Sequence, residues 1–180
     1  MFEGDPERSA ILLPGASYLP AAPLLWFTRE VLQADGWSVL QVWDEYDTGA
    51  DAHEWVAQRF EAALRLVGSV NTMLLVAKSL TSLALQEAAE RSLPGVWLTP
   101  LLHRPEVRAG LEATSAATLL IGGTGDATWD SEFVHGLSNV EVLEIKGADH
   151  ALQLARDPRA SLEALRAVVE RVGRFATRAT

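Results

Sequence analysis

Residues 74–90, LLVAKSLTSLALQEAAE, pass from an apolar, strand-like stretch directly into a helix-like one, with Lys78 and Ser79 at the join. A serine at such a join can be a nucleophile presented on a sharp turn, for which the usual motif is Gly-x-Ser-x-Gly. Residues 77–81 read AKSLT and contain neither glycine. A serine that caps the N-terminus of a helix is the other interpretation. The rest of the chain must therefore decide between the two.

The composition is that of one globular domain. The chain has 180 residues, of which 48% are hydrophobic and 22% charged, and this length is sufficient for a substantial core. We expect a single domain over residues 1–180 with flexible ends at residues 1–7 and 177–180. No internal repeat, low-complexity tract or linker divides it.

Charge and cysteine content argue against several classes of function. The net charge of −9 opposes binding to nucleic-acid phosphates and to anionic membranes. The chain has no cysteine, which excludes disulfides, thiolate metal sites and cysteine nucleophiles. Its first residues, MFEGDPERS, lack the basic start and apolar run of a signal peptide, and no apolar stretch approaches the roughly 20 residues of a membrane span. We therefore expect a cytoplasmic enzyme or binding domain.

Short apolar runs alternate with helical patterns along the whole chain. The runs expected to form strands are residues 10–13, 38–43, 73–77, 95–99, 118–122 and 140–145, and the helical patterns are residues 23–36, 54–67, 80–91, 105–113, 130–137 and 157–172. Continuous apolar runs are typical of parallel strands that are covered on both faces. The alternation predicts an α/β fold: a doubly wound, mostly parallel six-stranded sheet with helices on both faces.

Polar residues that follow the strands provide the candidate chemistry. In an open parallel sheet, ligands bind at the carboxyl ends of the strands. Ser79 follows the third expected strand, Asp126 the fifth and His150 the sixth. A serine hydroxyl needs a histidine to accept its proton, and that histidine needs a carboxylate to hold its tautomer. These three side chains, in this order along the chain, match the set and the order used by the α/β-hydrolase fold.

The chain resembles a small α/β-hydrolase without a lid, of the serine-esterase and dienelactone-hydrolase-like kind, from about residue 11 to residue 175. ILLPGASY resembles the strand and loop that carry His-Gly-x in many members, with Pro14 in place of the histidine. LLVAKSLTS resembles the nucleophile elbow, LLIGGTGDATW the strand and turn that deliver the acid, and VLEIKGADHAL the last strand and its Gly-x-x-His loop. The resemblance implies a hydrolase fold with no cap domain.

The resemblance also implies a role for each matched residue. Ser79 matches the nucleophile, Asp126 the acid and His150 the base. The backbone amides of Leu80 and Ala16 correspond to the oxyanion hole, which uses only N–H groups. Four further residues near the strand ends are candidates to line the pocket: Ser17, Tyr18, Trp43 and Trp129.

Other interpretations of these residues stay open from the sequence. Asp130 and Asp149 compete with Asp126, although Asp130 is better placed as a helix N-cap and Asp149 adjoins the histidine. Thr81 is branched where the elbow has glycine, so the neighbouring strands need small residues, for which Gly15 and Gly122–Gly123 are candidates. Lys78 is expected to be an exposed charge.

The sequence predicts a serine hydrolase that cleaves a small ester, a thioester or a related acyl bond through an acyl-enzyme. Its substrate is then a small molecule, no cofactor or metal is implied, and an exposed edge strand could pair two subunits. The alternative is a hydrolase-like binding protein with little or no catalysis, for which the missing glycines argue. A nucleotide-binding flavodoxin-like domain is a third interpretation. The sequence does not reveal which substrate is used.

Overall fold

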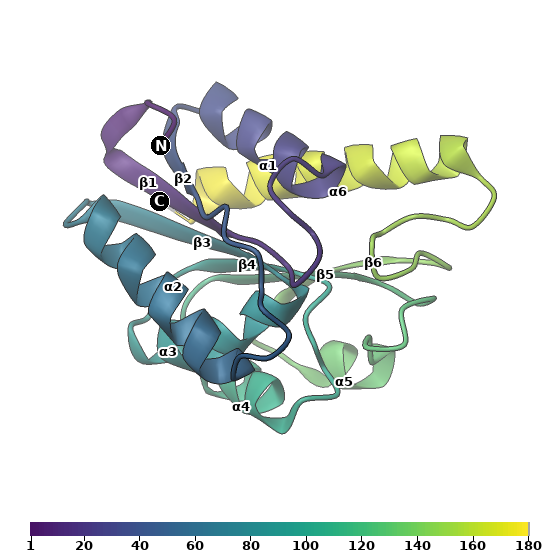
Figure 1. Ribbon diagram of the computed structural model, residues 1–180. Helices are drawn as coiled ribbons and strands as arrows, with labels where there is room; N and C mark the ends of the chain where they lie inside the picture. Colours follow the sequence, from purple (N-terminus) through teal and green to yellow (C-terminus); the bar gives the residue numbers. More distant parts are fainter. Residues whose placement is uncertain (180) are drawn as a thin grey trace.

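The computed structural model describes residues 1–179, which form a six-stranded sheet in the order β2-β1-β3-β4-β5-β6 (Figure 1). Every pairing between neighbouring strands is parallel. The strands are β1 (Asp5–Leu13), β2 (Trp37–Gln41), β3 (Thr72–Lys78), β4 (Gly95–Leu98), β5 (Thr118–Gly123) and β6 (Glu141–Ile145). The prediction of a mostly parallel six-stranded sheet is confirmed.

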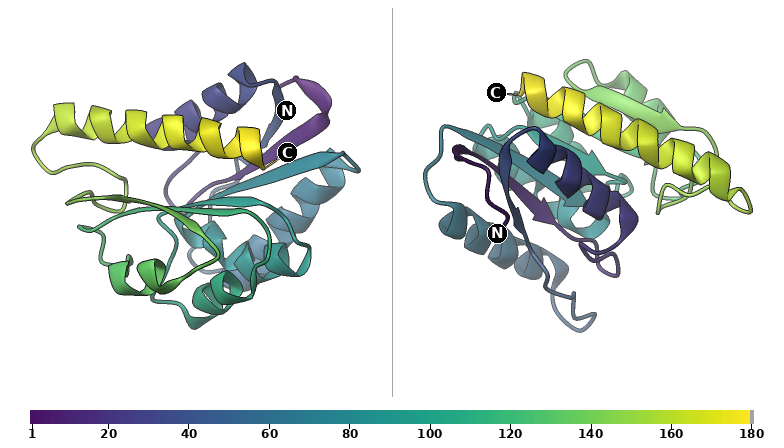
Figure 2. Two further views of the ribbon diagram at one scale, coloured as in Figure 1. Left: turned by 180° about the vertical axis from the view of Figure 1, so that it is seen from behind. Right: turned by 90° about the horizontal axis from the view of Figure 1, so that it is seen from above.

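Helices cover both faces of this sheet. The α-helices are α1 (Pro23–Ala34), α2 (Ala52–Val67), α3 (Leu85–Glu90), α4 (Pro105–Ala113), α5 (Ser131–Gly136) and α6 (Pro158–Arg178), and the 3₁₀ helix η1 (Ser79–Ala84) precedes α3. Helices α1 and α6 lie side by side on one face, and α2 to α5 lie on the other (Figures 1 and 2). The chain is therefore doubly wound, with no cap domain inserted between its elements.

Each face of the sheet has its own apolar core, because successive strand residues point to opposite sides. On β1, Ala10 and Leu12 pack into the core beneath α1 and α6, whereas Ile11 and Leu13 pack into the core beneath the other helices. All four side chains are fully buried. Burial on both faces explains why the strands read as continuous apolar runs rather than as alternating patterns.

Most observed element boundaries agree with local sequence signals, and some differ from the predicted ones. Helix α6 starts where predicted, since Pro158 occupies its first turn and the Asp157 carboxylate accepts a hydrogen bond of 2.9 Å from the Ala160 amide. Strand β1 begins at Asp5, five residues before its predicted start at Ala10. The predicted helix 80–91 is divided into η1 and α3.

Both ends of the described chain contact the sheet or continue a helix, and Thr180 lies outside the described residues. Phe2 and Val39 exchange two backbone hydrogen bonds of 2.8 and 2.9 Å beside β2. Helix α6 continues to Arg178. Flexibility of residues 1–7 and 177–180 stays a prediction. Among residues 1–179, no helix combines the length and the apolar character that crossing a bilayer would require.

The order of the strands reverses between β1 and β3. The chain moves outward from β1 to β2 and then returns to the other side of β1 to form β3. Crevices open at such a switch point because the loops after the two strands lead to opposite faces. The loop after β1 and the join after β3 therefore meet at the carboxyl edge of the sheet, where Ser79 lies.

Candidate active site

Ser79 lies on a strained turn between β3 and η1. Its φ angle is 55°, in the left-handed region that side chains other than those of Gly, Asn and Asp rarely adopt. Backbone strain of this kind is kept at sites where the surrounding fold holds a side chain in a required position. The Ser79 Oγ atom lies 2.7 Å from His150 Nε2. The hydroxyl is therefore directed at an imidazole and does not cap the following helix.

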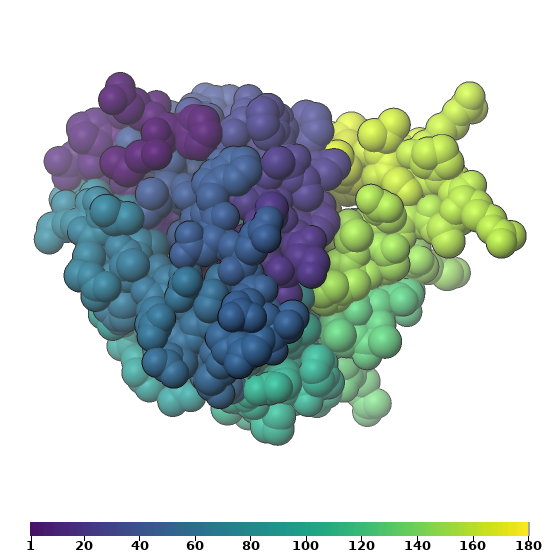
Figure 3. Space-filling model, in the orientation of Figure 1, coloured from purple at the N-terminus to yellow at the C-terminus, as the bar shows by residue number. Residues whose placement is uncertain are grey.

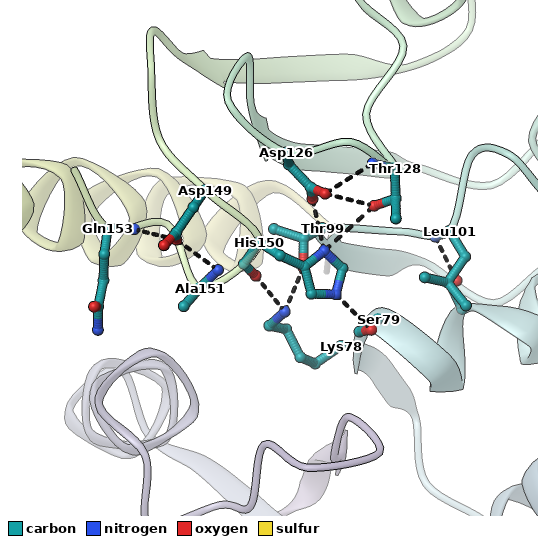
Figure 4. A network of polar contacts seen from close by, with 11 residues as sticks. Lys78, Ser79, Thr99, Leu101, Asp126, Thr128, Asp149, His150, Ala151 and Gln153 are labelled. Atoms are coloured by element: carbon teal, nitrogen blue, oxygen red, sulfur yellow. Dashed lines mark hydrogen bonds and ion pairs between the residues drawn. The ribbon is translucent and has the colours of Figure 1, made fainter. Parts of the chain in front are cut away.

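His150 lies on the loop after β6, between Ser79 and Asp126 (Figure 4). Its Nδ1 atom is 2.7 Å from Asp126 Oδ2. The loop is held by the neighbouring Asp149, whose Oδ1 accepts hydrogen bonds from the amides of Ala151 (2.8 Å) and Gln153 (2.9 Å). Asp149 thus shapes the histidine loop, and Asp126 is the carboxylate that contacts the imidazole.

Asp126 is nearly inaccessible and is held as a carboxylate. Burial acts to raise the pKa of its carboxyl group, but hydrogen bonds from His150 and Thr128 outweigh burial, so the pKa lies below its usual value. The amide and the hydroxyl of Thr128 both donate to Asp126 Oδ1, at 2.8 and 2.9 Å. Because an ionised carboxylate only accepts, His150 Nδ1 must donate to it, and in the neutral ring Nε2 is then free to accept from Ser79.

Lys78, the residue before Ser79, is buried, so the expectation of an exposed charge is wrong. Only 1% of its surface is accessible. Its Nζ donates to Thr99 Oγ1 and, at 2.7 Å, to the backbone carbonyl of His150. Burial lowers the pKa of Lys78 to about 8, against the opposing effect of the Asp126 and Asp149 charges. The ammonium group thus ties β3 and β4 to the histidine loop from beneath.

Thr81 fits the elbow because its hydroxyl has partners there. Its Oγ1 accepts a 3.0 Å hydrogen bond from the Lys78 amide and lies within donating distance of the carbonyls of Lys78 (3.1 Å) and Leu13 (3.3 Å). A Cβ at Gly15 would lie 3.2 Å from Tyr18 Cβ, within the turn that follows β1, and 3.4 Å from Lys78 Cγ, which is an ordinary contact. Gly122 and Gly123 do not contribute, since they pack against Trp129 and Ala148 instead.

The loop after β1 forms one wall of an open pocket of about 420 Å³ above Ser79. Gly15 and Tyr18 pair through backbone hydrogen bonds of 3.1 and 3.4 Å, which leaves Ala16 and Ser17 at the tip of the turn. Ala16, Ser17 and Tyr18 all line the pocket together with Ser79 and His150. Leu80 follows Ser79 as the second residue of η1 and is nearly buried.

The two tryptophans expected at the pocket do not line it. Trp43 is 52% exposed, beyond the end of β2. Trp129 is buried against Gly122, and its Nε1 donates to Glu144 Oε2 at 2.7 Å. Asp130 caps α5 by accepting from the Phe133 amide at 3.0 Å, as its position predicts. It is therefore not the acid partner of His150.

Three features of the site were not predicted from the sequence: Thr128, Thr99 and the burial of Lys78. Thr128 follows Asp126 by two residues, a spacing at which an aspartate side chain commonly accepts from the backbone of a turn, so a local signal for it existed. Thr99 follows β4, the strand paired with β3, and its Oγ1 accepts a hydrogen bond from Lys78 Nζ. That contact depends on strand pairing, which no short-range pattern in the sequence reveals.

Comparison with known proteins places the fold among the α/β-hydrolases. No protein-family model matches the chain, and no curated protein matches it in sequence. Solved structures do match, and they include a serine hydrolase without a lid. Residues 1–179 therefore have the α/β-hydrolase fold without a cap domain, as the sequence predicts.

Three of the similar structures illustrate the extent of the match. Est1E from Butyrivibrio proteoclasticus superposes with a TM-score of 0.79 at 16% identity, over 99% of this chain and 91% of that one. A serine hydrolase without lid from Xanthomonas campestris gives 0.69 at 14% identity, over 98% and 84% of the two chains. The alpha/beta hydrolase domain-containing protein 10 from mouse gives 0.74 at 12% identity, over 99% and 93%.

Proposed function

We propose that this protein is a serine hydrolase that cleaves an ester, a thioester or a related acyl bond. The observation that carries the proposal is the continuous line of contacts from Ser79 Oγ through the His150 ring to Asp126 Oδ2, with both links at 2.7 Å. The similar solved structures include esterases and serine hydrolases, which supports a hydrolytic activity of the same general kind.

The chemistry follows from the protonation states of these groups. His150 Nε2 accepts the proton of the Ser79 hydroxyl as Oγ attacks the carbonyl carbon, and the nearby Asp126 carboxylate stabilises the imidazolium that forms. The tetrahedral intermediate then collapses: the bond to the leaving group breaks and His150 returns the proton to that group. Water, activated by His150 in turn, cleaves the acyl-enzyme and restores the Ser79 hydroxyl.

The oxyanion of the intermediate needs donors that are already in place. We assign this role to the backbone amides of Ala16 and Leu80, one at the tip of the loop after β1 and the other directly after the nucleophile. Only N–H groups are required, so the replacement of the usual histidine by Pro14 before this loop removes no donor. The pocket above Ser79 is open and suits a small substrate.

Further proposals from the sequence concern the location, cofactor need, substrate and oligomeric state of the protein. We propose a cytoplasmic enzyme that needs no cofactor and acts on a small molecule. We also propose that an edge strand pairs two copies: β6 lies at one edge of the sheet, and all of its residues are partly accessible.

A fluorophosphonate probe tests the proposal directly, because it phosphonylates a serine that is activated as a nucleophile far faster than an ordinary serine. We expect one adduct by intact mass, its loss in Ser79→Ala, and its retention in Ser17→Ala. Ser17 is the matched control because it is an exposed serine of the same pocket. An unlabelled but folded wild-type protein, or an adduct that persists in Ser79→Ala, would contradict the proposal.

A further inference from the structure

An apolar groove of about 460 Å³ lies beside the pocket that holds Ser79. Its walls are the start of α1, residues 151–157 and the first turns of α6. The first turns of α6 project beyond the rest of the domain (Figures 1 and 3). The apolar side chains that line it are Pro23, Leu24, Leu152, Leu154, Leu162 and Leu165. The charged residues that also line it, Arg156 and Asp157, are both exposed.

The groove and the pocket above Ser79 are contiguous. Tyr18 and Ala151 line both of them, and Ala151 directly follows His150. The Tyr18 ring is fixed at this boundary because its hydroxyl accepts a 3.0 Å hydrogen bond from the amide of Leu24 at the start of α1. A molecule bonded to Ser79 therefore has an apolar surface within reach on the side of Tyr18 and Ala151.

The far wall of the groove is preformed rather than loose. Leu154 is tied to α6, because its amide donates to Ser161 Oγ at 2.9 Å. Leu152 is 3% exposed and has a φ angle of 58°, a conformation that is unfavourable for leucine. Leu152 packs into the core beneath α1 and α6, so the fold holds this wall in one conformation.

Apolar side chains continue from the groove onto the surface between α1 and α6. Leu162 is 66% exposed and Phe27 is 46% exposed. Together with Leu165 and Val169 they line a second hollow, of about 320 Å³. Exposed apolar surface joined to a site with few polar groups is typical of a ligand-binding groove.

We propose that this groove binds an apolar chain of the ester substrate, so that the enzyme prefers a medium-length chain to a short one. The inference rests on the proposed serine hydrolase activity and specifies its substrate class. The apolar chain belongs either to the acyl group or to the alcohol, and both present the same surface to the groove. Each methylene removed from water raises kcat/KM roughly fourfold while the groove is filling.

Two substrate series test the proposal. In the first, p-nitrophenyl acetate, butyrate and octanoate vary the acyl chain, and in the second, ethyl, butyl and octyl acetate vary the alcohol. All are used below their aggregation concentrations. We expect kcat/KM to rise at least about tenfold from the shortest to the longest member of one series, and that series identifies the end of the substrate that enters the groove.

Leu162→Asp tests the groove itself without threatening the core, since this side chain is mostly exposed. Leu165→Ser is a second variant with its side chain further into the groove. We expect each to reduce the preference for the long chain at least threefold, with the shortest substrate unchanged within twofold. Leu66→Asp is the matched control, because Leu66 is 71% exposed on α2, on the other face of the sheet.

The outcomes separate the groove from the catalytic proposal. Hydrolysis of the short esters with no chain-length preference in either series would refute the proposed role of the groove. The proposed serine hydrolase activity would then still hold. A Leu162→Asp variant that converts a dimer into a monomer by light scattering while it keeps the preference would refute the role of the groove as well, because the apolar face would then be an interface between copies. Failure to hydrolyse any ester, with no fluorophosphonate adduct, overturns both.

Discussion

Lys78→Met tests whether the ammonium beneath the active site is as dehydrated as its 1% exposure implies. Methionine has nearly the same length and shape but carries no charge. The pKa of Lys78 in the folded protein is about 8, against an ordinary value of 10.5. The difference corresponds to about 3 kcal/mol of folding free energy that the buried charge costs.

The direction of the pH dependence follows from which state binds the proton. Below about pH 8 the lysine is protonated in both the folded and the unfolded chain, so its unfavourable burial is fully expressed. Between about pH 8 and 10.5 the folded protein loses this proton while the unfolded chain keeps it. The free energy of unfolding therefore rises with pH over this window, by up to about 1.4 kcal/mol per pH unit from this group.

Urea unfolding of the wild type and Lys78→Met at pH 7, 8, 9 and 10 measures this contribution. Groups that titrate in the same range and lie far from Lys78 are present in both proteins and cancel in the difference. Tyr18 does not belong to them, because its ring centroid lies 5.1 Å from Lys78 Nζ. We expect the wild type to gain about 2 to 3 kcal/mol relative to the variant between pH 7 and 10. A difference that stays constant across these four pH values would refute the argument that Lys78 is a buried, desolvated cation.

Two further predictions concern the residues around Ser79. Asp126→Asn is expected to lower kcat for a short ester by about 10³- to 10⁴-fold, because the amide cannot hold the His150 tautomer; a loss of less than tenfold in steady-state assays would contradict it. Thr81→Gly restores the glycine of the usual elbow but removes the hydroxyl that bonds the Lys78 amide, so we expect it to reduce the free energy of unfolding by about 1 to 3 kcal/mol. Thr81→Ser, which keeps the hydroxyl, is its control, and an unchanged or raised urea midpoint for Thr81→Gly would show that the hydrogen bonds of Thr81 are dispensable.

The burial of Lys78 lowers the stability of the protein at the edge of the sheet where the proposed active site lies. A buried ammonium without an ion-pair partner in hydrogen-bonding contact is costly, yet its Nζ reaches the carbonyl of His150. The same join contains Ser79 in a strained conformation. Costs of this kind are concentrated where a fold must present a reactive group in one position.

The fold class and the positions of most elements could be predicted from local patterns in the sequence. Continuous apolar runs predicted strands covered on both faces, and the caps Asp130 and Asp157 marked helix starts because capping is a local hydrogen bond. Ser79, Asp126 and His150 were predicted as a catalytic set from their places after strands and from a resemblance to α/β-hydrolases. Parallel connectivity then delivers all three to the same edge of the sheet.

The surroundings of those residues depend on contacts between distant segments and could not be predicted in this way. Lys78 reads as a surface charge because lysine is rarely buried, and its burial depends on Thr99 and on the His150 loop, which come from distant parts of the chain. Trp43 and Trp129 were predicted to line the pocket and do not, because their positions also depend on how distant segments pack. Thr81 reads as an obstacle in the motif and fits only because Leu13 and Lys78 present carbonyls to it. Short-range patterns report backbone preference and burial of a face, whereas the partners of a side chain are set by packing between segments far apart in sequence.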